Sequence, residues 1–418
     1  MGKNNSSEYK DNSPDRQPDL STEMAERVPA TRRQTWAEID LAALKANYLN
    51  LRSLLPDPLD SAQSTSYRRR IIPVIKTDAY GHGAAEAART LAEAGVEMFA
   101  VGNVEEGIAL RQEGIHQDLL VLATTWQGQE SVALDHRLTL AVDSIRGLES
   151  LRASAGIKDL PAPVHIKVDT GMGRLGIRWD SLQAFLNVIR QSEHIQMEGV
   201  FTHLSSADDY DPSYTLNQCE RFESVLNEIR KAGLNPGEIH CANSAGLLYH
   251  PSLRRWGCRV GIALYGYAPV EGKTPIQLQP VLSLKTRVGP LRNAHPGESI
   301  GYSRKFTASR ETRYATLPIG YADGLPRRLS NNIQVIVRGG WAEVIGTVSM
   351  DMVTVDLTDR PDVCEGDEVI LLGSSGDCST NADTWAGNLG TISYEILCGI
   401  ATRVPRVYVN RPAGENSQ

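Results

Sequence analysis

One unit recurs along about half of this chain: a short apolar run followed by an amphipathic stretch. The repeat begins near residue 40, where the spacing of Leu and Ala predicts a helix in DLAALKANYLNLRSLL, with Asp40 as its N-cap. It ends near residue 262 and contains eight apolar or β-branched runs: IIPVIK, MFAVG, LLVLA, LTLAV, VHIKV, MEGVFTH, EIHCA and WGCRVGI. Eight strand candidates that alternate with helix-like segments predict a parallel (β/α)8 barrel.

The pattern changes from about residue 280. The later runs are short, rich in Val, Ile and Thr, and separated by Gly, Pro and Asp turns: LSLKTRV, ATLPIGY, NIQVIVRGG, AEVIGTV, MVTVDLT and DEVILLG. Since no long helix lies between them, they predict a mostly antiparallel β domain. The fold class is therefore α/β plus β, with an N-terminal (β/α)8 barrel over residues 34–279 and a C-terminal β domain over residues 280–412.

Composition narrows the possible partners and location. A net charge of −7 argues against a nucleic-acid partner, because phosphate contacts need a positive surface. No run approaches the ~18 apolar residues of a membrane span, and the first residues resemble no secretory signal. Residues 1–33 are polar and rich in Pro and Ser, which predicts a disordered tail, and residues 413–418 form a second tail.

The six cysteines contain no CxxC pair and have no histidine cluster beside them. This scatter argues against a metal site, so the prediction for metals is none. Reduced thiols and a cytoplasmic location are the expectation.

Polar residues stand at the ends of the predicted barrel strands or directly after them. They are Lys76, Lys167, Asp169, His203, Asn243, Ser244, Arg259 and Gly261. In such barrels the chemistry lies at the C-terminal ends of the strands, and phosphate often binds after strands seven and eight. The short helix that Ser244 opens has free N–H groups that could hold an anion. The sequence therefore predicts an active site with a phosphate at this rim.

Lys76 suggests what that site does. A lysine that ends an apolar strand is expected to be partly desolvated, which favours the neutral, nucleophilic amine. Its natural chemistry is a Schiff base with a substrate carbonyl or with pyridoxal phosphate. Two classes stay open on this evidence: a lysine-dependent aldolase for a phosphorylated sugar, and a pyridoxal-phosphate enzyme.

Nine segments taken in order resemble the alanine racemase family. In the barrel they are VIKTDAYGHG, HIKVDTGMGRLGI, GVFTHLSSAD, HCANSAG and CRVGIALYG; in the β domain they are IGYSRKF, PIGYADGLPRRLS, GTVSMDMVTVDL and TISYEILCGIATRVPRVY. The resemblance covers about residues 35 to 410. It implies a pyridoxal-phosphate isomerase that interconverts L-alanine and D-alanine, supplying D-alanine for peptidoglycan. Alternatives are a serine or broad-specificity racemase on the same scaffold and, more distantly, a non-catalytic pyridoxal-phosphate-binding protein.

The resemblance also assigns roles at the cofactor. Lys76 would carry pyridoxal phosphate and serve as one catalytic base, while Arg259 would face the pyridine nitrogen and His203 would orient Arg259. Because an arginine donates only, it would leave that nitrogen unprotonated and weaken the electron sink. The remaining cofactor-binding residues are Tyr80, Arg174, Asn243, Ser244, Gly261, Ile262 and Tyr394. Lys167 matches a position that is often carbamylated in the family.

A second base is expected from the β domain of another subunit. Tyr302 would act on the face of the substrate opposite Lys76, and the two bases would share the work of racemisation. Substrate-binding residues would be Arg174, Tyr321, Met350 and Asp351. The resemblance implies a homodimer in which Tyr302 of one chain serves Lys76 of its partner. Ser349 and Thr77 depart from the Cys and the Ala that are more frequent at these positions.

Overall fold

The computed structural model describes residues 33–56, 69–270 and 272–412. The predicted tails at residues 1–33 and 413–418 lie outside this part, apart from residue 33. In the described residues, no helix is long and apolar enough to span a membrane.

Eight parallel strands form a barrel, as predicted. They are β2 (Ile71–Pro73), β3 (Met98–Val101), β4 (Asp118–Val121), β5 (Thr139–Val142), β6 (Ala162–Asp169), β8 (Ile195–Phe201), β9 (Glu238–Ala242) and β10 (Gly257–Val260). Their order in the sheet is β2-β10-β9-β8-β6-β5-β4-β3. Between the two ends of this order, a single bridge joins Val74 to Ala100. The barrel is therefore nearly closed, and its seam lies between β2 and β3.

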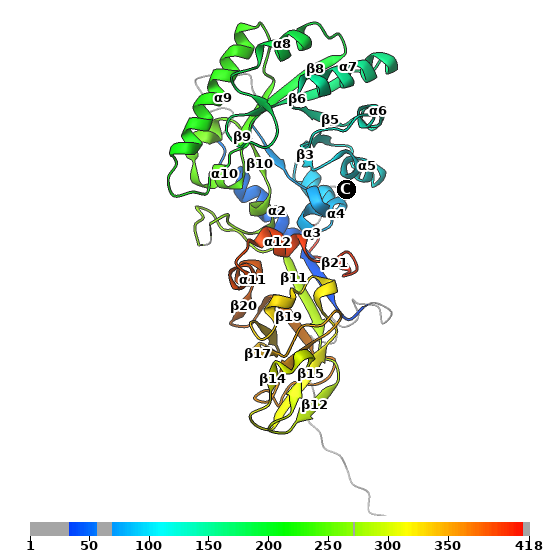
Figure 1. Ribbon diagram of the computed structural model, residues 1–418, viewed down its shortest axis with the longest axis vertical. Helices are drawn as coiled ribbons and strands as arrows, with labels where there is room; N and C mark the ends of the chain where they lie inside the picture. Colours follow the sequence, from blue (N-terminus) through cyan, green and yellow to red (C-terminus); the bar gives the residue numbers. More distant parts are fainter. Residues whose placement is uncertain (1–32, 57–68, 271, 413–418) are drawn as a thin grey trace, which may run out of the picture. The chain divides into compact units, whose positions relative to one another are not determined.

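Helices cover the outside of these strands (Figure 1). They are α2 (Leu41–Arg52), α4 (Ala84–Glu93), α5 (Val104–Gln112), α6 (Gln129–Asp135), α7 (Ile145–Lys158), α8 (Gln183–Arg190), α9 (Ser213–Lys231) and α10 (Ser244–Tyr249). Asp40 caps α2 as predicted, since its side chain accepts the N–H of Ala43 at 2.9 Å. In α4, Ala87, Ala88 and Leu91 are buried at helical spacing and cover the barrel.

The C-terminal residues form the predicted β domain. Its main sheet has the order β12-β15-β18-β17-β16-β19-β11-β1-β21, with β20 beside β19. These strands are β1 (Trp36–Asp40), β11 (Leu282–Arg287), β12 (Leu291–Ala294), β15 (Thr312–Leu317), β16 (Gln334–Val337), β17 (Gly340–Ile345), β18 (Val353–Asp356), β19 (Glu368–Ser375), β20 (Cys378–Thr380) and β21 (Arg406–Val409). In β18, Val353 and Val355 are buried while Thr354 is half-exposed, the alternation of a sheet with one packed face.

Strand β1 differs from the expected division at residue 34. Trp36 to Ile39 pair with β11 in antiparallel register, and Ala37 to Asp40 pair with β21 in parallel register. Residues 36–40 therefore belong to the second sheet, and the barrel region begins only at α2. The reason is that strand pairing depends on partners about 245 and 370 residues away, which a local pattern does not reveal.

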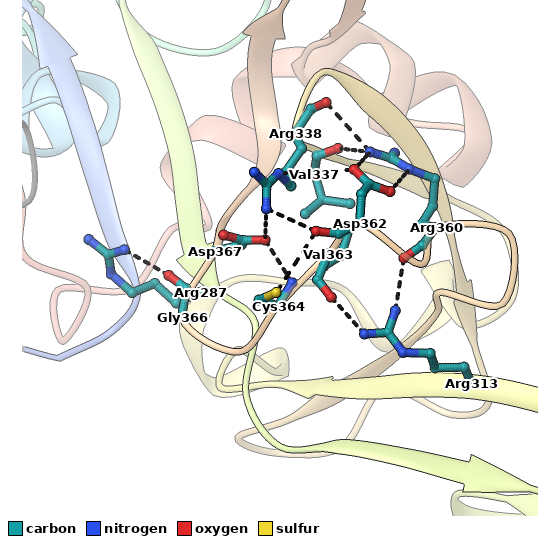
Figure 2. A network of polar contacts seen from close by, with 10 residues as sticks. All are labelled: Arg287, Arg313, Val337, Arg338, Arg360, Asp362, Val363, Cys364, Gly366 and Asp367. Atoms are coloured by element: carbon teal, nitrogen blue, oxygen red, sulfur yellow. Dashed lines mark hydrogen bonds and ion pairs between the residues drawn. The ribbon is translucent and has the colours of Figure 1, made fainter. Parts of the chain in front are cut away.

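Arginines hold the loop between β18 and β19 against neighbouring strands (Figure 2). Arg313 donates to the carbonyls of Arg360 and Val363, at 2.8 and 2.6 Å. Arg338 donates to the carbonyl of Asp362 at 2.9 Å and pairs with Asp367 at 3.3 Å. These bonds fasten an irregular segment by its backbone carbonyls, which would otherwise lack strand partners.

Candidate active site

A cavity of about 660 Å³ opens at the C-terminal ends of the barrel strands. Most of its wall is barrel, and α12 (Ser393–Cys398) of the C-terminal domain adds one side. The predicted residues that line it are Lys76, Tyr80, Lys167, Arg174, His203, Asn243, Ser244, Arg259, Gly261, Ile262 and Tyr394. Residues far apart in sequence thus meet at one rim because parallel strands all end on the same side.

Lys76 begins a turn of unusual backbone geometry, α3 (Lys76–Gly81). Thr77, Asp78, Ala79 and Tyr80 have φ values between 52° and 56°, the left-handed region. Such a conformation costs roughly 1–2 kcal/mol for each L-residue, so the surroundings must hold it. Hydrogen bonds do so: the N–H of Gly83 donates to the carbonyl of Asp78 at 2.9 Å, and the N–H of Ala84 donates to the Asp78 carboxylate at 2.7 Å.

The turn buries Tyr80 and leaves Lys76 exposed toward the cavity. The expectation that Lys76 is partly desolvated stays a prediction, because an exposed side chain that lines a cavity can still lose part of its hydration. The apolar strand ends before the lysine, and the turn carries its side chain away from the packed interior.

One end of the cavity is lined by hydroxyl groups and backbone N–H groups. The hydroxyl oxygen of Ser244 accepts from the N–H groups of Gly261 and Ala263, at 3.2 and 3.3 Å. Both lone pairs of that oxygen are then occupied, so its own O–H remains to donate to a ligand. A Cβ at Gly261 would collide with the hydroxyl of Tyr80, which explains why the chain approaches Tyr80 at a glycine. Burial raises the pKa of Tyr80, so this hydroxyl also stays a donor.

Arg259 lines the cavity but is buried, with only 4% of its surface exposed. It donates to Nδ1 of His240 at 2.9 Å, to Nδ1 of His203 at 3.2 Å and to the carbonyl of Thr202 at 2.7 Å. Burial lowers the pKa of Arg259 to about 10, which still leaves it charged at neutral pH. Because these acceptors are neutral, they do not compensate the positive charge of the guanidinium, which can therefore act on a ligand bound in the cavity.

These bonds determine where the protons lie on two buried histidines, His240 and His165. Because Arg259 only donates, Nδ1 of His240 must accept, and the single proton of neutral His240 lies on Nε2. That Nε2–H donates to Nδ1 of His165 at 2.7 Å. Burial, followed by nearby arginines, lowers the pKa of His165 to about 3 and that of His240 well below its usual value. Nε2 of His165 has no partner among the described residues.

Sequence reasoning missed both His240 and His165. Each lies in a predicted strand, EIHCA or VHIKV, and is almost fully buried. A histidine inside an apolar barrel strand is the signal that could have pointed to them. The expected contact between His203 and Arg259 is present, and His240 provides the shorter one.

Lys167 also lines the cavity. Its Nζ donates to the carbonyl of Leu122 at 2.8 Å. Burial lowers the pKa of Lys167 to about 8, and the positive charges of Arg259, Arg174 and Lys76 act in the same direction. A substantial neutral fraction near pH 8 makes this amine reactive toward electrophiles. Asp169 does not line the cavity; its carboxylate accepts the N–H groups of Gly171 and Gly173 and shapes the loop that carries Arg174.

Tyr394 lines the cavity, but the other four predicted residues of the β domain do not. Tyr302, Tyr321 and Met350 are 70%, 43% and 53% exposed, and the side chain of Asp351 is 51% exposed. Backbone bonds bring three of them together, since the N–H of Tyr321 donates to Ser349 and that of Ala322 donates to Met350. Thr347 donates to the carbonyl of Tyr302 at 2.9 Å. We call this exposed group (Tyr302, Tyr321, Met350 and Asp351) the Tyr302 surface.

The cavity suits pyridoxal phosphate in its donor set. Ser244, Tyr80 and the backbone near Gly261 offer donors for a phosphate, and Arg259 offers a donor for a ring nitrogen. Lys76 supplies a primary amine at the same cavity, which can bond covalently to an aldehyde carbon. Of the two residues expected to act as bases, Lys76 lines this cavity and Tyr302 does not.

Comparisons with known proteins agree with this geometry. Family models match residues 39–269, described as "Alanine racemase, N-terminal domain", and residues 281–408, described as "Alanine racemase, C-terminal domain". The chain is 42% identical to the alanine racemase of Symbiobacterium thermophilum, covering 90% of this chain and 97% of that protein. It is 39% identical to the alanine racemase of Halothermothrix orenii, covering 91% and 98%.

Solved structures are similar over the same extent. An alanine racemase from Clostridium difficile 630 has a TM-score of 0.83 at 35% identity, covering 90% of this chain and 96% of that one. An alanine racemase from Bacillus anthracis with bound L-Ala-P has a TM-score of 0.84 at 32% identity, covering 94% and 98%.

Proposed function

Because the chain belongs to the alanine racemase family, and is therefore an amino-acid racemase, we propose that it interconverts L-alanine and D-alanine with pyridoxal phosphate. The observation that carries the proposal is the meeting of Lys76, Arg259, Ser244 and Tyr80 at one cavity of a chain in this family. When bound, the cofactor would draw electrons from the Cα of the amino acid and so make its proton removable.

In this proposal the barrel residues bind and orient. Lys76 holds the cofactor covalently, and Ser244, Tyr80, Gly261, Ile262 and Tyr394 bind its phosphate, with Asn243 capping the adjacent helix. Arg259 donates to the ring nitrogen and keeps it unprotonated, which limits electron withdrawal and suppresses transamination. His203 and His240 hold Arg259 in place. Support comes from the distances of 2.9 and 3.2 Å between these groups.

Two bases would transfer the proton on opposite faces of Cα. Lys76 holds the proton on one face, and Tyr302 of the partner chain holds it on the other. The exposure of Tyr302, 70%, supports a role toward a second chain, as does its absence from the cavity lining. A homodimer with shared active sites is therefore part of the proposal, with Arg174, Tyr321, Met350 and Asp351 around the substrate.

We also propose that Lys167 is carbamylated. The ammonium group would first lose one proton, and the neutral amine would then add to the carbon of carbon dioxide and release a second proton. The side chain would thus change from a cation to a carbamate anion near Arg174. The pKa of about 8 and the three neighbouring cations support this step. Electron density tests it: an unmodified lysine that meets only water and the Leu122 carbonyl would contradict it.

The product would supply D-alanine for peptidoglycan, and we propose a cytoplasmic location. Six cysteines without a disulfide are consistent with a reducing compartment. A racemase for serine or for a broader set of amino acids remains the alternative, since it needs the same residues around Cα.

Two measurements test the function. Purified protein with added pyridoxal phosphate should gain a visible absorption band and racemise alanine. Rates with serine, lysine and arginine should be much lower than with alanine. Comparable rates on the larger amino acids would replace alanine with a broader substrate class, and a protein without an absorption band would overturn the cofactor proposal.

A further inference from the structure

The barrel seam coincides with the site of Lys76. Between β2 and β3, the bridge at Val74 and Ala100 is followed by one bond from the N–H of Ile75 to the carbonyl of Ala100, at 2.9 Å. Beyond that point the two strands continue into Lys76 and Gly102, respectively. The reactive lysine therefore lies where backbone pairing is sparsest, directly before four left-handed residues.

One carboxylate joins the two strand ends above the seam. Glu106, in the first turn of α5, accepts the N–H of Thr77 at 2.8 Å through Oε1 and the N–H of Gly102 at 2.7 Å through Oε2. Thr77 directly follows Lys76. Both oxygens are thus used, and each receives a short, charge-assisted bond of the stronger kind.

Packing brings Lys76 into the same small space. A Cβ built at Gly102 would lie 3.1 Å from Oε2 of Glu106 and 3.5 Å from Cβ of Lys76. Gly102, Glu106 and the base of the Lys76 side chain are therefore mutual neighbours. An alanine at position 102 would therefore press on the carboxylate, while its Cβ would lie at ordinary van der Waals distance from Lys76.

We propose that Glu106 is the positioning residue for Lys76: it holds the backbone on both sides of the seam and so sets the direction in which the lysine enters the cavity. The inference rests on the proposed function. The neighbouring Glu105 has no such role, because it is exposed and accepts from Gln129 at 2.7 Å on the outer side of the helix.

Substitution by glutamine distinguishes Glu106 from Glu105. A glutamine at position 106 has one acceptor oxygen and one donor NH2 group, so it can accept from only one of the two N–H groups. Its NH2 would face the other N–H, and donor would oppose donor. Glu106→Gln therefore disrupts the clamp with little change in size, and Glu105→Gln removes an equal charge one residue away.

The test compares wild type, Glu106→Gln and Glu105→Gln, with Gly102→Ala as a second disruption that keeps the charge. Two quantities are measured: the rate at which added pyridoxal phosphate forms its covalent band with Lys76 in the apoprotein, and kcat per bound cofactor. A misplaced reacting group can lower a rate about 10- to 100-fold. We expect a loss of this order in both quantities for Glu106→Gln and Gly102→Ala, with KM for alanine changed less than about threefold. Glu105→Gln should stay within about twofold of wild type.

Each outcome has a distinct meaning. A purely structural role would lower the melting temperature but leave kcat per bound cofactor and the covalent rate unchanged, which would overturn the proposal. Equal values for Glu106→Gln and Glu105→Gln would overturn it as well. If Glu106→Gln does not fold, Gly102→Ala decides between the same two results. A wild-type protein that neither binds the cofactor nor racemises alanine would instead refute the proposed function.

Discussion

The barrel rim and the Tyr302 surface hold their polar residues in opposite ways. Arg259 and His240 are 4% and 0% exposed, and hydrogen bonds within the chain hold them in place. Tyr302 and Met350 are 70% and 53% exposed and lie away from the cavity. The barrel can thus orient its groups within one chain, whereas the second group needs a surface from outside to exclude water. Under the proposed function, the site has one half that the single chain preorganises and a second half that association with a partner chain would complete.

The largest effect would come from mixing two inactive variants. Lys76→Ala and Tyr302→Phe should each lose nearly all racemase activity, because each site then lacks one base. A mixed dimer would hold one site with both bases and one with neither. With random reassortment half of the dimers are mixed, so activity should recover to roughly a quarter of wild type. Subunit exchange demonstrated by mass, without recovered activity, would contradict a site shared between chains.

Acid should destabilise the folded chain through its buried histidines. Burial lowers the pKa of His82 to about 4 and that of His165 to about 3, and it lowers the pKa of His240 well below its usual value. Above pH 6.5 these groups are neutral in both states, and their protonation does not affect stability. As the pH falls from 6.5 toward 4, the unfolded chain binds protons that the folded chain does not, so the free energy of unfolding decreases.

The expected loss is about 2 kcal/mol for each of the three histidines between pH 7 and pH 5, or up to about 6 kcal/mol together. Denaturant titrations at several pH values measure it. The exposed His116→Gln variant is the control and should retain the same pH dependence. A free energy of unfolding that stays level over this range would contradict the neutral buried histidines.

The smallest expected effects are changes in the free energy of unfolding, measured for one substitution from each region. In His240→Leu, buried Arg259 loses the imidazole nitrogen that accepts its hydrogen bond, and His165 loses the N–H group that donates to it. The substitution should therefore lower the free energy of unfolding by about 1–3 kcal/mol. Tyr302→Phe removes an exposed hydroxyl and should change it by about 0.5 kcal/mol or less, despite its large effect on activity. Denaturant unfolding of both variants gives these values. Similar losses of stability would remove the distinction between the two regions.

Much of the fold follows from local sequence patterns. The eight barrel strands and the Asp40 cap were predicted because apolar runs of strand length alternate with helical spacing. The residues at the strand ends could be proposed as one site for a related reason, since parallel strands all end on the same side of a sheet. By contrast, Tyr302 was identified only through resemblance, because an exposed tyrosine after a short strand carries no local signal.

Other features depended on the folded chain. WAEID, read locally, belongs with the helix that follows it, yet β1 pairs with β11 and β21 in the second sheet. EIHCA predicts a strand but does not tell where the imidazole of His240 points. Glu105 and Glu106 are adjacent acids in one helical turn, and only one of them reaches the N–H groups of Thr77 and Gly102.

Residue spacing and residue type were sufficient to predict the periodicity of the elements, the class of each domain and the chemical groups at the strand ends. The partners of β1, the tautomer of His240, the exposure of Lys76 and the contacts of Glu106 became evident only in the folded chain. The two sets of features differ in range: helical and strand periods depend on neighbours a few residues away, whereas burial and hydrogen-bond partners depend on segments that meet only after the whole chain has folded.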